Sequence, residues 1–442
     1  MNKLCNPIEP FSSSHSVQVV AAVVDRLPVP LVESNIRTSE NALQDNAHSA
    51  DSEGISLLLL DQAEIQGKAA GPHQLRSAGV EEPVLALSIQ TADSSKPEGT
   101  VHSPPHEFGL RLANTTFTNG REHTLFGEIW ACNEQYIPQQ QSLELKGSLD
   151  LVKCLVRFVI GSVHSSFEFP LYPVSQRRQV VSCMGNILRQ LAKSTDGQAS
   201  GAIPASLELE GTLPRYISEH DIDDQRVSVW ALLEKSDHGV SAESDIQARV
   251  KESLQAGGKL LRIMSGGGGW GKKQGLLSLD PETEFLDSAD LRTLLTLPEL
   301  IYTAHRGRAA DSSHPFEEEL AINELSSLSH IVEPGDYIQF FVSVEPEPVE
   351  EAYSKLPAND QGGNVSFCFG VLSDKEDEML YGNEEVYQKD VPITLPHYFG
   401  ALSEKAITYS QPVIEIGSSD TPVPSATKLD LPGCRVELVL QK

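Results

Sequence analysis

Four consecutive glycines, followed by a tryptophan, a fifth glycine and two lysines, form the stretch of this sequence best suited to chemistry. The residues are Gly266, Gly267, Gly268, Gly269, Trp270, Gly271, Lys272 and Lys273. A glycine run reaches φ > 0 readily and has no side chains, so its backbone N–H groups approach a ligand closely. Together with two ammonium groups, such a loop binds a small anion. The alternative is a structural loop that folds Trp270 back onto the core.

The loop fits known phosphate-binding motifs only in part. Gly266 and Gly271–Lys272 match G-x-x-x-x-G-K, but Lys273 stands where a magnesium-binding Ser or Thr is required. The dinucleotide pattern G-x-G-x-x-G also fits, because a glycine run satisfies any glycine spacing. Both motifs need a helix directly after the loop, whereas residues 275–281 predict a strand that ends in a turn. Phosphate or nucleotide binding is therefore one of two hypotheses, and the cofactor is unknown.

Other reactive side chains do not form a catalytic or metal-binding constellation. His102 and His106 are four residues apart, but Pro104–Pro105 prevent the helix that would align their imidazoles. Cys368 and His397 are too close in sequence for the nucleophile and base of a hydrolase, and phenylalanines flank Cys368 as in a protein core. The six cysteines contain no C-x-x-C pair. We therefore predict no metal, and leave open whether the protein is an enzyme.

The chain is strongly acidic, with a formal net charge of −28 at pH 7. This charge argues against general nucleic-acid binding and against binding to anionic membranes. Residues 251–275 reverse the trend, with five basic side chains against one acidic side chain. The reversal supports a small anion at the loop. A second basic group in residues 305–308, with His305, Arg306 and Arg308, is expected to be solvated.

The sequence predicts an intracellular location. The first thirty residues lack a signal peptide, and no apolar run reaches the ~20 residues of a membrane span. The scattered cysteines suit a reducing compartment. We expect the cytoplasm, with the mitochondrial matrix as the alternative because residues 12–14 are serines.

Residues 1–105 and 106–442 differ in composition. The first region predicts a loosely structured or partly disordered segment, because Ser, Asp, Pro and Gly are dense between two apolar runs. These runs, residues 17–24 and 55–60, are candidate strands. Residues 106–442 predict a mixed α/β folded core, with a potential division near 195–240.

Strand signals dominate the second region. Asn119–Gly120 predicts a type I′ hairpin between strands over 110–118 and 122–130. Further strands are predicted over 143–160, 226–233, 336–344, 364–372 and 430–440.

Helical spacing is confined to three segments. They are residues 176–193, residues 241–258 ending at Gly257–Gly258, and residues 289–295 with Ser288 as the cap. We therefore expect the α+β class, mainly antiparallel sheet with a few amphipathic helices, because strands and helices do not alternate regularly.

Two functions follow from these features. The first is a non-catalytic interaction or assembly protein, which presents acidic loops and a helix face to a protein partner. The second is a phosphate- or nucleotide-binding protein, with or without catalysis, that uses the loop 266–273.

Overall fold

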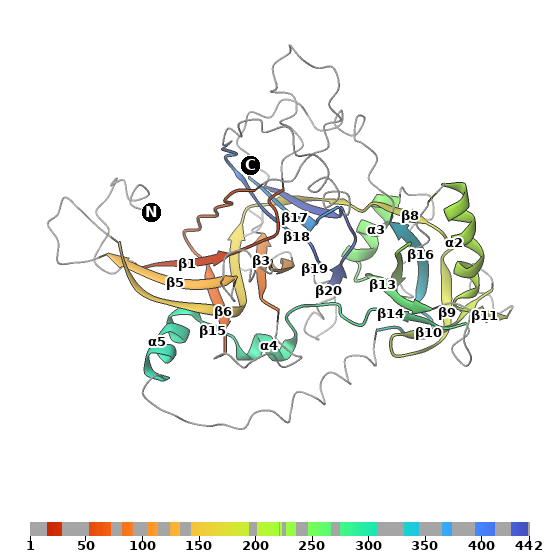
Figure 1. The fold of residues 1–442 in the computed structure, drawn as a ribbon, viewed down its shortest axis with the longest axis horizontal. Helices are drawn as coiled ribbons and strands as arrows, with labels where there is room; N and C mark the ends of the chain where they lie inside the picture. The colour runs from red at the N-terminus through yellow and green to blue at the C-terminus, as the bar shows by residue number, and fades with distance from the viewer. Residues whose placement is uncertain are drawn as a thin grey trace, which may run out of the picture.

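The protein is rich in β-structure. Its computed structural model describes residues 16–28, 53–71, 82–91, 104–113, 124–132, 143–193, 201–220, 222, 227–235, 246–266, 275–307, 331–343, 365–373, 394–411 and 426–440. Strands make up 53 % and helices 15 % of this part. Figure 1 shows two bodies side by side, a sandwich of two sheets and a closed barrel. The expectation of a fold rich in β-sheet with a few helices is confirmed at this level.

The larger sheet of the sandwich has nine strands. They are β1 (Ser16–Ala22), β2 (Glu64–Ala69), β3 (Val84–Thr91), β4 (His106–Arg111), β5 (Leu125–Cys132), β6 (Leu143–Ile160), β15 (Leu295–Thr296), β19 (Ile407–Ser410) and β20 (Ala426–Leu429). Seven follow the order β1-β5-β6-β3-β4-β19-β20, and β2 pairs with β6 and β15. Three strands of the N-terminal 105 residues, β1 to β3, therefore belong to the same sheet as β4 to β6.

The smaller sheet of the sandwich has four strands in the order β18-β17-β21-β7. They are β7 (Val163–Glu168), β17 (Ser366–Val371), β18 (Tyr398–Ser403) and β21 (Arg435–Leu440). Among the described pairings, only β17 with β18 and β3 with β6 are parallel. The mainly antiparallel arrangement thus holds for the described strands. The predicted strands over 143–160, 364–372 and 430–440 correspond to β6, β17 and β21.

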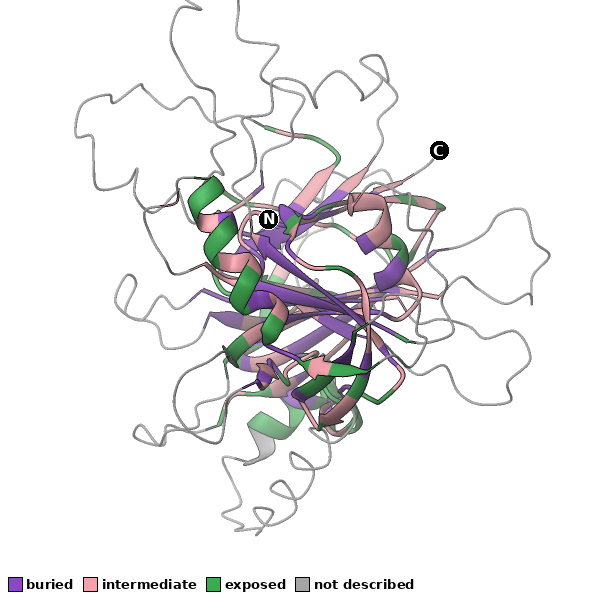
Figure 2. Cartoon of the chain, turned by 90° about the vertical axis from the view of Figure 1, so that its right-hand side faces the viewer, coloured by how far each residue is buried: buried purple, intermediate pink, exposed green. Residues whose placement is uncertain are grey.

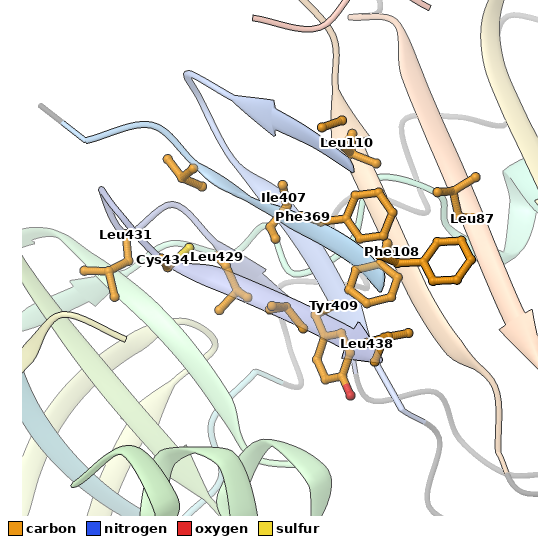
Figure 3. Packing of buried hydrophobic residues seen from close by; sticks show 14 of the residues in the cluster. Leu87, Phe108, Leu110, Phe369, Ile407, Tyr409, Leu429, Leu431, Cys434 and Leu438 are labelled. Carbon is orange, nitrogen blue, oxygen red and sulfur yellow. The ribbon is translucent and has the colours of Figure 1, made fainter. Parts of the chain in front are cut away.

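Aromatic side chains from both sheets fill the sandwich core (Figure 3). The ring of Phe108 on β4 lies 4.6 Å from the ring of Phe369 on β17, centroid to centroid. Tyr409 on β19 packs against Phe108 at 5.4 Å and against Phe167 on β7 at 5.2 Å. These contacts join strands that are far apart in sequence, so the two sheets form one hydrophobic core.

Six strands close the barrel in the order β9-β10-β14-β13-β12-β16, because β9 pairs with both β10 and β16. They are β9 (Arg178–Met184), β10 (Ile187–Ala192), β12 (Val229–Glu234), β13 (Lys259–Gly266), β14 (Leu277–Leu279) and β16 (Tyr337–Ser343), with β8 (Leu171–Pro173) and β11 (Ala202–Pro204) attached. Val229, Ala231 and Leu233 on β12 belong to the barrel core, whereas Trp230 and Leu232 belong to the sandwich core. Both faces of β12 are therefore buried, as its continuous apolar sequence predicts.

Side-chain hydrogen bonds fix the barrel against the sandwich. The indole N–H of Trp230 donates to Asp430 Oδ1 at 2.8 Å. Thr427 Oγ1 on β20 accepts from the backbone N–H of Leu260 at 2.8 Å and donates to its carbonyl at 3.1 Å. One hydroxyl thus satisfies both the backbone N–H and the backbone carbonyl of a β13 residue across the interface.

Four helices are described: α2 (Leu207–Glu219), α3 (Ile246–Gln255), α4 (Ser288–Thr293) and α5 (Leu297–Gly307). Figure 2 shows exposed residues (green) on the outward faces of the helices and buried residues (purple) on the strands beneath them. The predicted helix 241–258 corresponds to α3, which buries Val250 and Leu254 and ends before Gly257 at φ 88°. The predicted cap of α4 is wrong by one residue. Asp287 accepts from the N–H groups of Ala289 and Asp290, so Asp287 is the cap.

The predicted helix over 176–193 is wrong, because this segment is the hairpin of β9 and β10. Met184 pairs with Ile187 across the two-residue turn Gly185–Asn186, in which Gly185 has φ 62°. A glycine at the first turn position is typical of a tight hairpin. The apolar side chains that suggested a helix lie in the barrel core instead; they include Val180, Leu188 and Leu191.

Two other sequence predictions about strands are also wrong. β4 pairs with β3 and β19, while β5 pairs with β1 and β6, so these two strands do not form the predicted hairpin. The turn Asn119–Gly120 itself lies outside the described residues. Residues 55–60 form no strand in the structure. The local turn signal was overridden because β4 and β5 pair with other strands.

Candidate functional site

The predicted anion loop connects β13 to β14. Gly266 is the last residue of β13 and pairs with Leu277 of β14. Residues 267–274, which include Gly267, Gly268, Gly269, Trp270, Gly271, Lys272 and Lys273, lie outside the described residues. Anion binding by this loop therefore stays a prediction.

A groove of about 420 Å³ lies at the base of these two strands, between them and α2. Its volume is within the usual range for small-molecule sites. Most of its described lining is aliphatic, and none of these lining residues is aromatic. The aliphatic residues include Leu209, Leu213, Val227, Val229, Ile263 and Leu277.

Arg262 of β13 is the basic group of the groove. Its Nη2 donates to Ser228 Oγ at 3.0 Å, and its Nη1 lies 3.8 Å from Asp430 Oδ2. The guanidinium carbon lies 5.7 Å from the centre of the Trp230 ring. A guanidinium has five N–H donors, and 43 % of this side chain is exposed. Arg262 is thus held in place by Ser228, Asp430 and Trp230, and part of its side chain is exposed to solvent.

The first half of α2 supplies the acidic group of the groove. Ser206 Oγ donates to Glu210 Oε1 at 2.6 Å, which positions this carboxylate. Pro214, one turn further along α2, has no N–H to donate to the carbonyl of Glu210. Glu210 and Pro214 both line the groove. The α2 wall is therefore rich in hydrogen-bond acceptors.

The sequence did not predict α2. Leu209, Leu213 and Tyr216 have helical spacing, but Gly211 and Pro214 interrupt the segment and favour a turn-rich reading. Tertiary packing decides the outcome, because Leu209 and Tyr216 are buried against the barrel. In addition, Arg178 of β9 makes two hydrogen bonds to Glu208, at 2.8 and 3.1 Å.

Among the described side chains, the other basic residues near the loop in sequence do not line the groove. Lys251 Nζ donates to the carbonyl of Ser165 at 2.6 Å. Lys259 is half-buried, and desolvation lowers its pKa. His305 and Arg306 belong to α5, which packs on β2, β5 and β6 on the opposite side of the molecule from β13 (Figure 1); Arg308 lies outside the described residues. Of the described basic side chains in residues 251–262, only Arg262 lines the groove.

A second feature is a row of exposed aliphatic side chains on residues 55–60. Ile55, Leu57 and Leu59 are 92, 63 and 66 % exposed, while Leu58 and Leu60 pack against the sandwich core. The alternation shows an extended segment with one apolar face toward water. Ser56 Oγ accepts from the N–H of Gly400 on β18 at 3.2 Å, which holds the segment beside the smaller sheet. We call Ile55, Leu57 and Leu59 the apolar ridge.

His106, one of the histidines noted in the sequence, is a buried core residue. Its Nδ1 lies 3.1 Å from the hydroxyl of Tyr409, which donates to Gln411 Oε1 at 3.2 Å. Desolvation lowers the pKa of His106 from 6.5 to about 4. His106 is therefore neutral at pH 7 and completes a buried chain of hydrogen bonds.

This pKa shift predicts a pH dependence of stability. Between pH 6.5 and pH 4 the unfolded chain binds a proton at His106 that the folded chain does not bind, so acidification favours unfolding. The expected loss is about 3 kcal/mol over this range. Urea denaturation of the protein and of its His106→Gln variant should show the wild-type advantage shrinking by this amount from pH 7 to pH 4.

The wild type must be compared with the His106→Gln variant, because the protonation of other groups has the opposite effect on stability. Burial raises the pKa of Glu107, Glu168 and Glu437, so these carboxyls favour the folded state on acidification. Parallel pH profiles for the two proteins would contradict the assignment to His106.

Cys368 is buried in β17 between Phe367 and Phe369. It pairs in register with Gly400 and Glu437 on the neighbouring strands. This position agrees with its interpretation as a small hydrophobic side chain. Among the described residues, no group of three His, Cys, Asp or Glu side chains is arranged to hold a metal ion.

None of the described helices is long and apolar enough to cross a membrane. No protein-family model matches the chain, and no curated protein or solved structure matches it either.

Proposed function

We propose that the protein is a non-catalytic interaction protein, which binds a protein partner through the apolar ridge. The observation that carries this proposal is the exposure of Ile55, Leu57 and Leu59 on one face of an extended segment. Contiguous apolar side chains at a protein surface commonly mark interaction sites. Each of these side chains would leave water when a partner docks, which is favourable by about 25 cal/mol per Å² of apolar surface.

The shape of the ridge favours an extended partner segment. Residues 55–60 form no ladder with any described strand. A strand laid against such a segment gains backbone hydrogen bonds and places alternate apolar side chains against the ridge. This mode of binding needs no pocket in either protein.

The charge around the ridge favours a basic partner. Glu53, Asp61 and Glu64 flank the segment, and the whole chain has a net charge of −28. Arg26 neutralises one of these groups, because its Nη1 lies 2.5 Å from Glu53 Oε1. Lysine or arginine on both sides of an apolar partner strand would therefore speed association and fix its register. Phosphate or nucleotide binding at residues 266–273 stays a separate prediction.

Photo-crosslinking tests this proposal. A photoreactive amino acid at position 57 should give one discrete crosslinked product in an extract of the source cells. The same amino acid at Leu291, which is 41 % exposed on α4, is the matched control and should give none. The product should disappear when Ile55 and Leu59 are both changed to serine, and should weaken at high salt. Equal products from both positions, or none from position 57, would contradict the proposal.

A further inference from the structure

We propose that the groove between α2 and the barrel binds a zwitterionic aliphatic ligand, an apolar amino acid or a short apolar peptide with free termini. This inference does not depend on the apolar ridge, which lies on the sandwich. It rests on three properties of the described lining of the groove: its aliphatic surface, its single basic group and its single acidic group.

The lining of the groove determines the apolar part of the ligand. Leu209, Leu213, Val229, Ile263 and Leu277 provide branched aliphatic surface, and the described lining offers no aromatic ring for stacking a nucleobase. Leu209, Val229 and Leu277 are themselves buried in the barrel core, so the groove has a firm apolar floor. A leucine- or valine-like side chain is complementary to this surface.

Arg262 determines one end of the ligand. Its side chain makes one hydrogen bond to a described residue, to Ser228, and the contact with Asp430 at 3.8 Å is too long to be a second. The remaining N–H donors match a carboxylate, which a guanidinium binds through paired hydrogen bonds. Ser228 and Ser265 line the groove on the same wall and add hydroxyl donors.

Glu210 determines the other end. Ser206 donates to one of its carboxylate oxygens, and the helix leaves the Glu210 carbonyl without its usual donor because of Pro214. A carboxylate suits an ammonium group, which has three N–H donors. A simple fatty acid would instead meet the negative charge of Glu210. The two walls thus favour a ligand with both charges.

The test is a binding series with matched probes. Calorimetric titration compares leucine, Leu-Leu and Leu-Leu-Leu with 4-methylpentanoate, which lacks the ammonium group, and with 3-methylbutylamine, which lacks the carboxylate. At least one zwitterion should bind about tenfold more tightly than both singly charged analogues, because charged groups make the stronger hydrogen bonds. Inorganic phosphate and ATP are included to detect binding to an anion loop.

Four variants assign the binding to the groove. Arg262→Gln should weaken the best zwitterion about tenfold and leave 3-methylbutylamine unchanged. Glu210→Gln should also weaken the zwitterion but leave 4-methylpentanoate unchanged or bound more tightly. Leu213→Trp should fill the groove and abolish binding. Arg292→Gln, on the exposed surface of α4, should change nothing.

The proposal is overturned by any of three results. These are no binding of the zwitterions, equal binding of the singly charged analogues, and zwitterion binding that neither Arg262→Gln nor Glu210→Gln weakens. Both glutamine variants change partly exposed groups, so they remain informative if Leu213→Trp does not fold. Binding of phosphate or ATP without binding of the zwitterions would also overturn it, and would favour the loop 266–273 instead.

Discussion

Replacing Glu234 with alanine should destabilise the protein by about 3–5 kcal/mol, because it removes a buried carboxylate and leaves two partly buried arginines without their counter-charge. The Glu234 side chain is only 2 % exposed. Its Oε2 accepts from Arg177 Nε at 2.5 Å and lies 3.6 Å from Arg249 Nη2. Arg249 Nε and Nη2 have no hydrogen-bond partner among the described residues, so this carboxylate is the main compensation for the Arg249 charge. Urea denaturation at pH 7 measures the loss.

An exposed ion pair provides the control for Glu234. Glu219 lies 3.6 Å from Arg215 on the surface of α2, where both side chains are more than half exposed. Glu219→Ala should therefore cost no more than about 0.5 kcal/mol. Changing Glu234 and Arg249 together to methionine should recover part of the loss, since the uncompensated charge disappears with its partner. Equal effects of Glu234→Ala and Glu219→Ala would contradict this account of the barrel.

Replacing Phe369 with alanine should cost about 3–5 kcal/mol by opening a cavity between the two sheets of the sandwich. Phe369 is fully buried, 4.6 Å from the Phe108 ring and 6.3 Å from the Phe399 ring, centroid to centroid. Its neighbours come from the opposite sheet and from the adjacent strand, so they cannot all collapse into the space. The loss of stability is measured by urea denaturation, with Phe369→Leu expected to be intermediate.

Val159 on β6 is the surface control for Phe369. It is 59 % exposed, although its neighbour Phe158 is buried in the same core. Val159→Ala should change the free energy of unfolding by about 0.5 kcal/mol or less. A loss below about 1 kcal/mol for Phe369→Ala would mean that the sandwich core does not join the two sheets as the structure shows.

The sequence predicted a strand correctly where its hydrophobic pattern directly reflects which residues are buried. Residues 143–150 alternate and residues 151–158 are almost continuously apolar, and β6 changes from half-exposed to buried at this point. The strands β12 and β16 were predicted for the same reason, because both consist mostly of apolar residues. In each case, the strand is covered on both faces, and the need for apolar residues on both faces can be seen within one segment of the sequence.

Strand pairing and barrel closure were not predictable, because they depend on partners far away in sequence. Ile338 on β16 pairs with Arg178 on β9, and this contact closes the barrel. Nothing local in 176–193 distinguishes a helix from this hairpin except Gly185–Asn186. The groove was likewise not predictable, since Glu210 and Arg262 line the same groove only because α2 packs on the barrel.

The most direct test of the proposed interaction surface is the solvent exposure of the apolar ridge in the free protein. Methyl NMR with a soluble nitroxide reports this exposure for each side chain. We expect strong broadening of the methyl signals of Ile55, Leu57 and Leu59, and weak broadening for Leu58 and Leu60, as their burial requires. Equal protection of all five side chains would show that the ridge is already covered, and would contradict its role as a free docking surface.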